Sequence, residues 1–133
     1  MAGRGSTEWT TEHWTALLRL MSLMVVVDGR VREEELRVFV YRMMGLRRRL
    51  APDMMFSDGM VRDWFAAHRD GMAELSPEAR AGVLDEAGDR LGGLGMGREI
   101  VEGLDAVSRA DGHRHDAERE LIADMAARWG VAL

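Results

Sequence analysis

Cysteine and lysine are both absent from this chain of 133 residues. Without cysteine the chain can form no disulfide, no thiolate metal site and no cysteine nucleophile, which fits the reducing cytoplasm where we expect the protein. Every basic side chain other than histidine is an arginine, and we attach no functional weight to that bias. The net charge of −5 argues against nucleic-acid binding, because affinity for phosphate requires a positive surface.

Long apolar runs are also missing. The longest apolar stretch, 17–27, is interrupted by Arg19 and Ser22 and is too short to cross a bilayer. The first residues lack the basic and long apolar regions of a signal peptide. Hydrophobic residues make up 47% and charged residues 31%, which is typical of a globular protein. We expect one domain over 1–133, with 1–9 as a loosely ordered lead-in, although Trp9 and Trp14 could fold onto the domain.

The alternating apolar pattern of a half-buried β-strand does not occur either, and the apolar residues recur at helical spacing instead. Helices are predicted over about 11–27, 33–44, 58–69, 77–91, 98–110 and 116–129. The glycine-rich segment 92–97 is predicted to be a flexible hinge. The expected fold class is all-α, a compact bundle of six to seven helices.

An Asp-Gly pair stands twice between an apolar helix and an acidic helix start. Asp28 is followed seven positions later by Glu35, and Asp111 is followed at the same spacing by Glu118. At the offset of 83 residues, apolar positions also coincide, as in Leu17 with Ile100, Met21 with Leu104 and Phe39 with Ile122. The repeat predicts two related helical hairpins joined by a two-helix insertion.

The repeat resembles the second half of an EF-hand calcium loop, with Gly29 in the place of the central glycine and Glu35 in that of the bidentate ligand. The earlier ligand positions would then be Met24 and Val26, which carry no side-chain oxygen. The second copy has Val107 and Arg109 there. A true EF-hand is therefore excluded.

Two interpretations of the acidic turns stay open. Carboxylates brought together repel unless a proton or cation lies between them, so Asp28, Glu35 and their counterparts could form a site for a hard divalent ion. His113 and His115 flank the second turn and could add nitrogen ligands, which favours zinc or another transition metal. Alternatively the aspartates cap the following helices and the glutamates suit the positive helix ends, which is the commoner use of such residues.

The methionines offer a different function. Flexible methionine side chains can line an adaptable protein-binding groove, although at helical spacing they also fill cores. The candidates are Met43, Met44, Met54, Met55 and Met60. No Gly-rich phosphate loop, Ser/His/Asp order or metalloprotease helix is present, so we expect no enzyme. A metal-dependent hydrolase would need a base and an open coordination position, and no residue can be named for either.

The stretch L-L-R-L-M-S-L-M-V-V-V-D-G-R-V-R-E-E-E-L resembles the TerB-like family, the tellurite-resistance and DjlA N-terminal type of helical domain. The matching residues are Asp28, Gly29, Val31, Glu34 and Glu35 in the first half. In the second half they are Ala110, Asp111, Gly112, Glu118 and the ending Trp129-Gly130-Val131.

The resemblance implies a cytoplasmic, bacterial, stress-associated helical module that binds a divalent cation and has no catalytic activity. Carried over residue by residue, it points to Asp28, Glu34, Glu35, Asp111 and Glu118 as ligands. The ion could be Ca²⁺, Mg²⁺, Mn²⁺ or Zn²⁺. The alternative is an interaction adaptor that docks a protein partner, or a second copy of the chain, on its methionine-rich surface while the acidic turns are purely structural.

Overall fold

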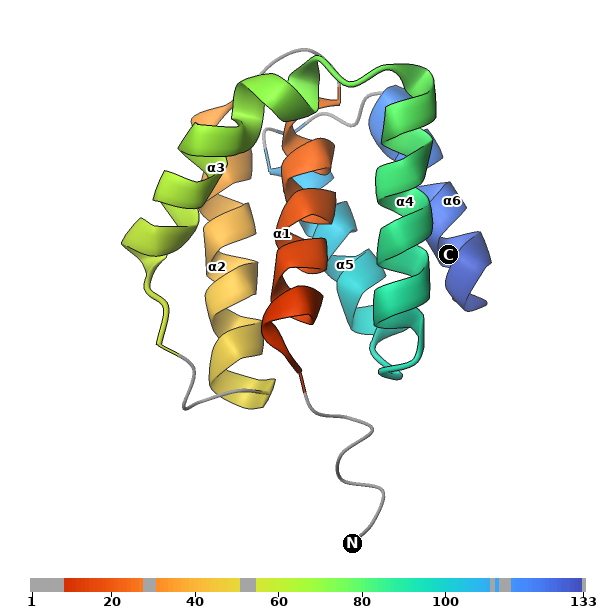
Figure 1. Cartoon of the computed structure of the whole chain (residues 1–133), viewed down its shortest axis with the longest axis horizontal. Coiled ribbons are helices and arrows are strands. Elements are labelled where there is room, and N and C mark those ends of the chain that lie inside the picture. The colour runs from red at the N-terminus through yellow and green to blue at the C-terminus, as the bar shows by residue number, and fades with distance from the viewer. Residues whose placement is uncertain (1–8, 28–30, 51–54, 111, 113–115, 133) are drawn as a thin grey trace, which may run out of the picture.

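In the computed structural model, the residues that the structure describes form six α-helices (Figure 1). The structure describes residues 9–27, 31–50, 55–110, 112 and 116–132. The helices are α1 (Thr11–Val26), α2 (Glu33–Leu50), α3 (Asp58–Ala73), α4 (Pro77–Gly92), α5 (Gly97–Arg109) and α6 (Asp116–Trp129). None of the described residues lies in a β-strand, which confirms the predicted all-α bundle. Across those same ranges, no helix is long and apolar enough to cross a membrane.

Helix α1 is at the centre of the bundle. It packs most extensively against α4 and α3, and it also contacts α5 and α2. Figure 1 shows α2 and α3 on one side of α1, α4 and α6 on the other, and α5 behind it. Apolar residues occur all round this helix rather than along one stripe, so most of its side chains can be buried at once.

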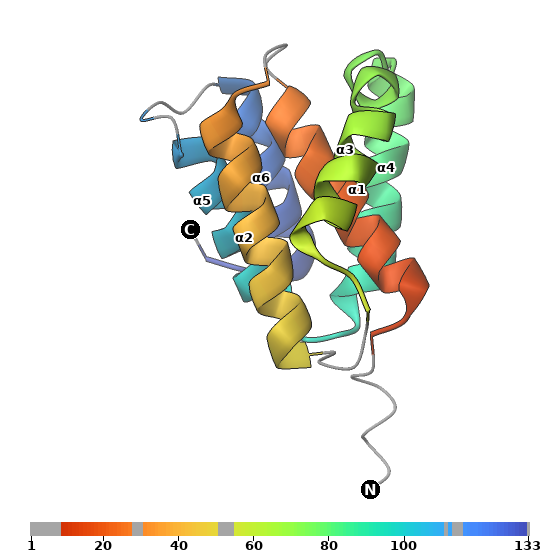
Figure 2. The same ribbon diagram turned by 90° about the vertical axis from the view of Figure 1, so that its left-hand side faces the viewer.

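The order of the helices matches the predicted hairpins. Helices α1 and α2 form one pair, α5 and α6 form the other, and α3 and α4 lie between them in the sequence. The pairs are joined by contacts of α5 with both α1 and α2. The last turns of α1 and α5 and the first turns of α2 and α6 all lie at the same end of the bundle, the upper end in Figures 1 and 2.

Helix α2 is longer than predicted. The sequence analysis ends it at Met44 because Gly45 follows, but α2 continues to Leu50. A glycine in a helix interior costs about 1 kcal/mol relative to alanine. Leu46 is buried and Leu50 is partly buried, so they extend the face begun by Met43 and favour the helix over a break at Gly45. Three arginines occupy the last turn, where positive charge suits the helix dipole.

Trp129 packs against the helix ends on either side of the connection between α4 and α5, the glycine-rich segment for which the sequence predicts a flexible hinge. Its indole donates a hydrogen bond from Nε1 to the Gly88 carbonyl oxygen of α4, at 3.2 Å. A Cβ added to Gly97 would lie 2.9 Å from the Cβ of Trp129, and one added to Gly92 would lie 3.2 Å from its Nε1. Glycine is present at these two positions because the tryptophan needs the space.

The end of α6 agrees with the prediction. Gly130 follows the helix with φ of +65°, the left-handed conformation that favours glycine. The Val131 amide donates to the Ala126 carbonyl at 2.9 Å, and the Gly130 amide donates to that of Ala127 at 3.4 Å. These two bonds form a Schellman motif, which satisfies carbonyl groups left without partners at the helix end.

Candidate functional site

The first turns of α2 and α6 each carry a glutamate that is fully buried. Glu35 and Glu118 both have an exposed fraction of 0%, and each is the third residue of its helix. From that position a carboxylate can accept a hydrogen bond from the backbone N–H at the start of the helix, and the helix dipole favours its negative charge. Both side chains take part in polar interactions in this structure.

The glutamates beside Glu35 point elsewhere. Glu33 and Glu34 are exposed, and Glu33 pairs with Arg62 of α3 at 3.0 Å. Successive residues of an α-helix are rotated by about 100°, so only one of three adjacent side chains can face the interior here. Of the two predicted ligands in this turn, Glu35 is therefore enclosed by the bundle, whereas Glu34 faces the solvent.

The other predicted ligands, Asp28, Asp111, His113 and His115, lie outside the described residues. Within the ranges that the structure describes, no group of three or more histidines or acidic residues is arranged to hold a metal ion. Glu34, Glu35 and Glu118 thus do not make a site among themselves. The cation site stays a prediction that depends on the two turns.

The two buried glutamates belong to separate turns. Although α2 and α6 begin at the same end of the bundle, Figure 1 shows α1 and α5 between them, and α2 and α6 are not among the helix pairs that pack extensively. This arrangement disfavours a single ion held by both glutamates. It favours one site per turn, each formed by the residues of its own hairpin.

A second surface feature is an apolar cleft of about 370 Å³ between α1 and α3. Met55 and Met60 at this cleft are 87% and 53% exposed. The lining residues are Thr11, Trp14, Thr15, Leu18, Met55, Phe56, Met60, Val61 and Trp64. The sequence alone does not indicate this cleft, because α1 and α3 are far apart in the chain and their aromatic residues look like ordinary core positions.

The methionines predicted to form a surface divide into two groups. Met43 and Met44 are buried, and Met54 lies outside the described residues. Of the four that the structure describes, Met55 and Met60 are exposed at the cleft. The methionine surface at the cleft, as far as the structure describes it, is thus smaller than the sequence suggests, and Trp14, Phe56 and Trp64 line the cleft beside it.

No protein-family model, curated protein or solved structure matches this chain. The resemblance to the TerB-like family therefore depends on the two Asp-Gly turns and the residues that follow them.

Proposed function

We propose that this protein is a non-enzymatic, TerB-like stress module that binds a divalent cation at its Asp-Gly turns. The observation that supports this most is the equivalent placement of Glu35 and Glu118. Each lies seven residues after the aspartate of its turn, and each is fully buried at the same end of the bundle. The helical bundle itself fits the family that the sequence resembles.

Burial makes these carboxylates suitable ligands. Taking an ionised carboxylate out of water costs several kcal/mol unless hydrogen bonds or a nearby cation compensate. A divalent cation in the turn would supply that compensation and would also draw in the aspartate. Oxygen donors alone suit Ca²⁺, Mg²⁺ or Mn²⁺, as expected at the first turn. His113 and His115 beside the second turn make that turn more suitable for Zn²⁺.

Divalent ions should stabilise the protein against unfolding. Glu35→Gln should remove the part of this stabilisation that comes from an ion bound at the first Asp-Gly turn. Glutamine at the third helical position keeps the hydrogen bond to the helix start but not the charge that attracts the cation. At 100 times its dissociation constant, an ion that binds only the folded state adds about 2.7 kcal/mol to the free energy of unfolding. Thermal unfolding of metal-stripped protein, with and without each of the four ions, measures this.

Glu120→Gln is the matched control for that experiment, because Glu120 is exposed on α6 two residues beyond Glu118. Glu120→Gln removes one negative charge, as Glu35→Gln does, and should leave unchanged the increase in the free energy of unfolding that the metal ions produce. If no ion raises the unfolding temperature, or if Glu35→Gln retains the full gain in Ca²⁺, Mg²⁺ and Mn²⁺, the glutamates serve the helix ends only and the proposal is wrong.

The second candidate function is a protein-interaction adaptor, and the cleft between α1 and α3 supports it. Two flexible methionines beside aromatic side chains suit the docking of an apolar helix face, a mode in which side chains at helical spacing enter a groove. This function does not require any cation at the turns. The two candidates can therefore be separated by variants at different ends of α1.

Met60→Glu should weaken apolar binding at the cleft without unfolding the protein, because Met60 is 53% exposed and lies in the first turn of α3. The fluorescent probe anilinonaphthalene sulfonate, which binds exposed apolar surface, provides the measurement. We expect bound-probe fluorescence in the native protein and a several-fold loss in Met60→Glu. Ala81→Glu on the exposed side of α4 is the control; an equal loss there, or no native binding, would rule out an accessible cleft.

A further inference from the structure

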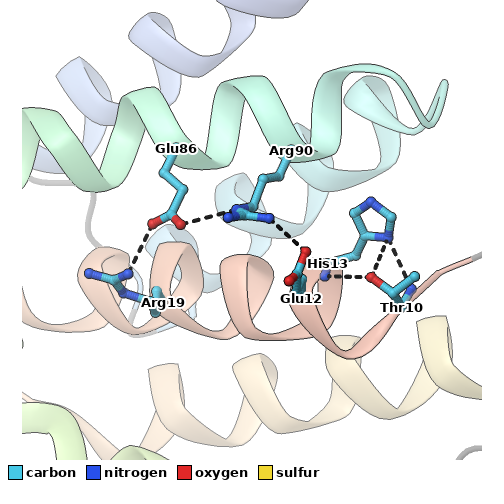
Figure 3. A network of polar contacts seen from close by, with 6 residues as sticks. All are labelled: Thr10, Glu12, His13, Arg19, Glu86 and Arg90. Atoms are coloured by element: carbon cyan, nitrogen blue, oxygen red, sulfur yellow. Dashed lines mark hydrogen bonds and ion pairs between the residues drawn. The ribbon is translucent and has the colours of Figure 1, made fainter.

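Helix α1 begins with a capping box in which the usual acidic residue is replaced by histidine. Thr10 is the N-cap, and its hydroxyl oxygen accepts from the His13 backbone N–H at 3.4 Å. In return, the Thr10 backbone N–H donates to Nδ1 of the His13 ring at 3.0 Å (Figure 3). Glutamate or glutamine normally fills this third helical position, where its side-chain oxygen is the acceptor.

This substitution makes the cap sensitive to protons. Nδ1 can accept the Thr10 N–H only while it carries a lone pair, so the neutral ring must hold its proton on Nε2. A protonated imidazole donates from both nitrogens, and the Thr10 N–H then loses its acceptor. The Thr10 hydroxyl, 3.2 Å from Nδ1, could accept from the charged ring, but it cannot replace the lost acceptor of the N–H.

The cap holds a buried aromatic side chain in place. Trp9 directly precedes Thr10 and is only 5% exposed. Its ring lies 4.5 Å from that of Trp14 and 6.1 Å, edge-on, from that of His13, measured between ring centroids. Trp14 in turn contacts Phe56 at 5.4 Å. Trp9 is thus attached to the bundle by apolar contacts at its ring and by the capping box at the adjoining peptide.

The charges around His13 are mostly paired with one another. Glu12 on α1 pairs with Arg90 of α4 at 2.9 Å, and Glu86 of α4 bridges Arg90 and Arg19, each at 3.0 Å (Figure 3). The hydrogen bond with Glu86, followed by the charge of Glu12, raises the pKa of Arg90, so Arg90 stays charged. On the α2 side, the Arg47 guanidinium lies over Phe56, 5.9 Å from the ring centroid.

We propose that His13 is a proton-controlled latch that holds Trp9 on the bundle when neutral and releases it when protonated. Protonation of Nδ1 breaks the bond from the Thr10 N–H, and Trp9 then detaches from the bundle. Release uncovers the face of Trp14 that Trp9 occupies. The capping box lies at the start of α1, whereas Glu35 and Glu118 lie in helix turns at the opposite end of the bundle.

Tryptophan fluorescence between pH 8 and pH 5 tests the latch, with His68→Gln as the reference protein. His68 stacks on Trp64 at 4.1 Å and would add its own pH response. Loss of a helix cap of ordinary strength shifts the equilibrium between docked and released Trp9 about fivefold. We expect a red shift of the emission and a rise in acrylamide quenching on acidification, both absent when Trp9→Phe is added.

Adding His13→Gln to the reference protein should abolish the pH response and keep Trp9 docked throughout, because the glutamine oxygen accepts at any pH in this range. His13→Ala should release Trp9 at both pH values. A pH response that survives His13→Gln would overturn the proposal, and so would an emission spectrum of the reference protein that does not change with pH.

Discussion

Phe39→Ala is expected to lower the free energy of unfolding by about 3–5 kcal/mol, the usual cost of deleting a buried phenylalanine side chain. Phe39 is fully buried in α2, and its ring meets that of Phe65 in α3 edge to face at a centroid distance of 5.9 Å. The variant loses both the apolar burial and this aromatic pair. Urea unfolding followed by circular dichroism measures the change.

Tyr41 is the control on the same helix. It lies two residues further along α2 and is 70% exposed, so Tyr41→Ala should change the free energy of unfolding by no more than about 0.5 kcal/mol. Equal effects of the two substitutions would mean that the face of α2 packed against α3 is assigned incorrectly.

Replacing Gly97 or Gly45 with alanine should change the free energy of unfolding in opposite directions. A Cβ on Gly97 meets the Cβ of Trp129 at 2.9 Å, so Gly97→Ala should destabilise the protein by about 1–3 kcal/mol through overpacking. A Cβ on Gly45 meets nothing within 4 Å, and the residue lies inside α2. Gly45→Ala should stabilise by about 0.4–1 kcal/mol, because alanine has less conformational freedom to lose.

A double-mutant cycle assigns the Gly97 effect to Trp129. In a Trp129→Gly background the Cβ that the new methyl group meets is absent, so Gly97→Ala should cost less than in the native protein. Thermal unfolding of the native protein, the two single variants and the double variant gives the coupling free energy between the two positions. An unchanged cost would locate the strain elsewhere, in the backbone of the α4–α5 connection.

The positions of the helices could be predicted well from the sequence because their start and stop signals are local. Ser57 and Ser76 cap α3 and α4 through their hydroxyl groups, and Asp116–Trp129 forms α6 with the predicted bounds. The prediction failed at Gly45, where tertiary packing outweighs a local break. The packing of Gly92 and Gly97 against Trp129 could not be predicted, because Trp129 is remote in sequence.

The candidate site could also be predicted only in part, because the burial of its residues depends on contacts with parts of the chain that are remote in sequence. The spacing of seven residues singles out Glu35 and Glu118, and both are buried at helix starts. It could not distinguish Glu35 from Glu34, because that depends on which side of α2 meets the bundle. For Trp9 the sequence left a lead-in and a folded position open, and the structure shows it buried against Trp14 beside a capping box that a histidine completes.

The central place of α1 has a consequence for how the chain is made. Protein synthesis delivers α1 before any of its neighbours, yet its most extensive contacts are with α4 and α3, and α5 completes its enclosure. Until those segments have left the ribosome, α1 lacks most of the contacts that bury it in the folded bundle. Nascent chains that expose apolar surface are prone to aggregation, which chaperones counter. We therefore expect folding of the bundle to be sensitive to how long α1 stays uncovered.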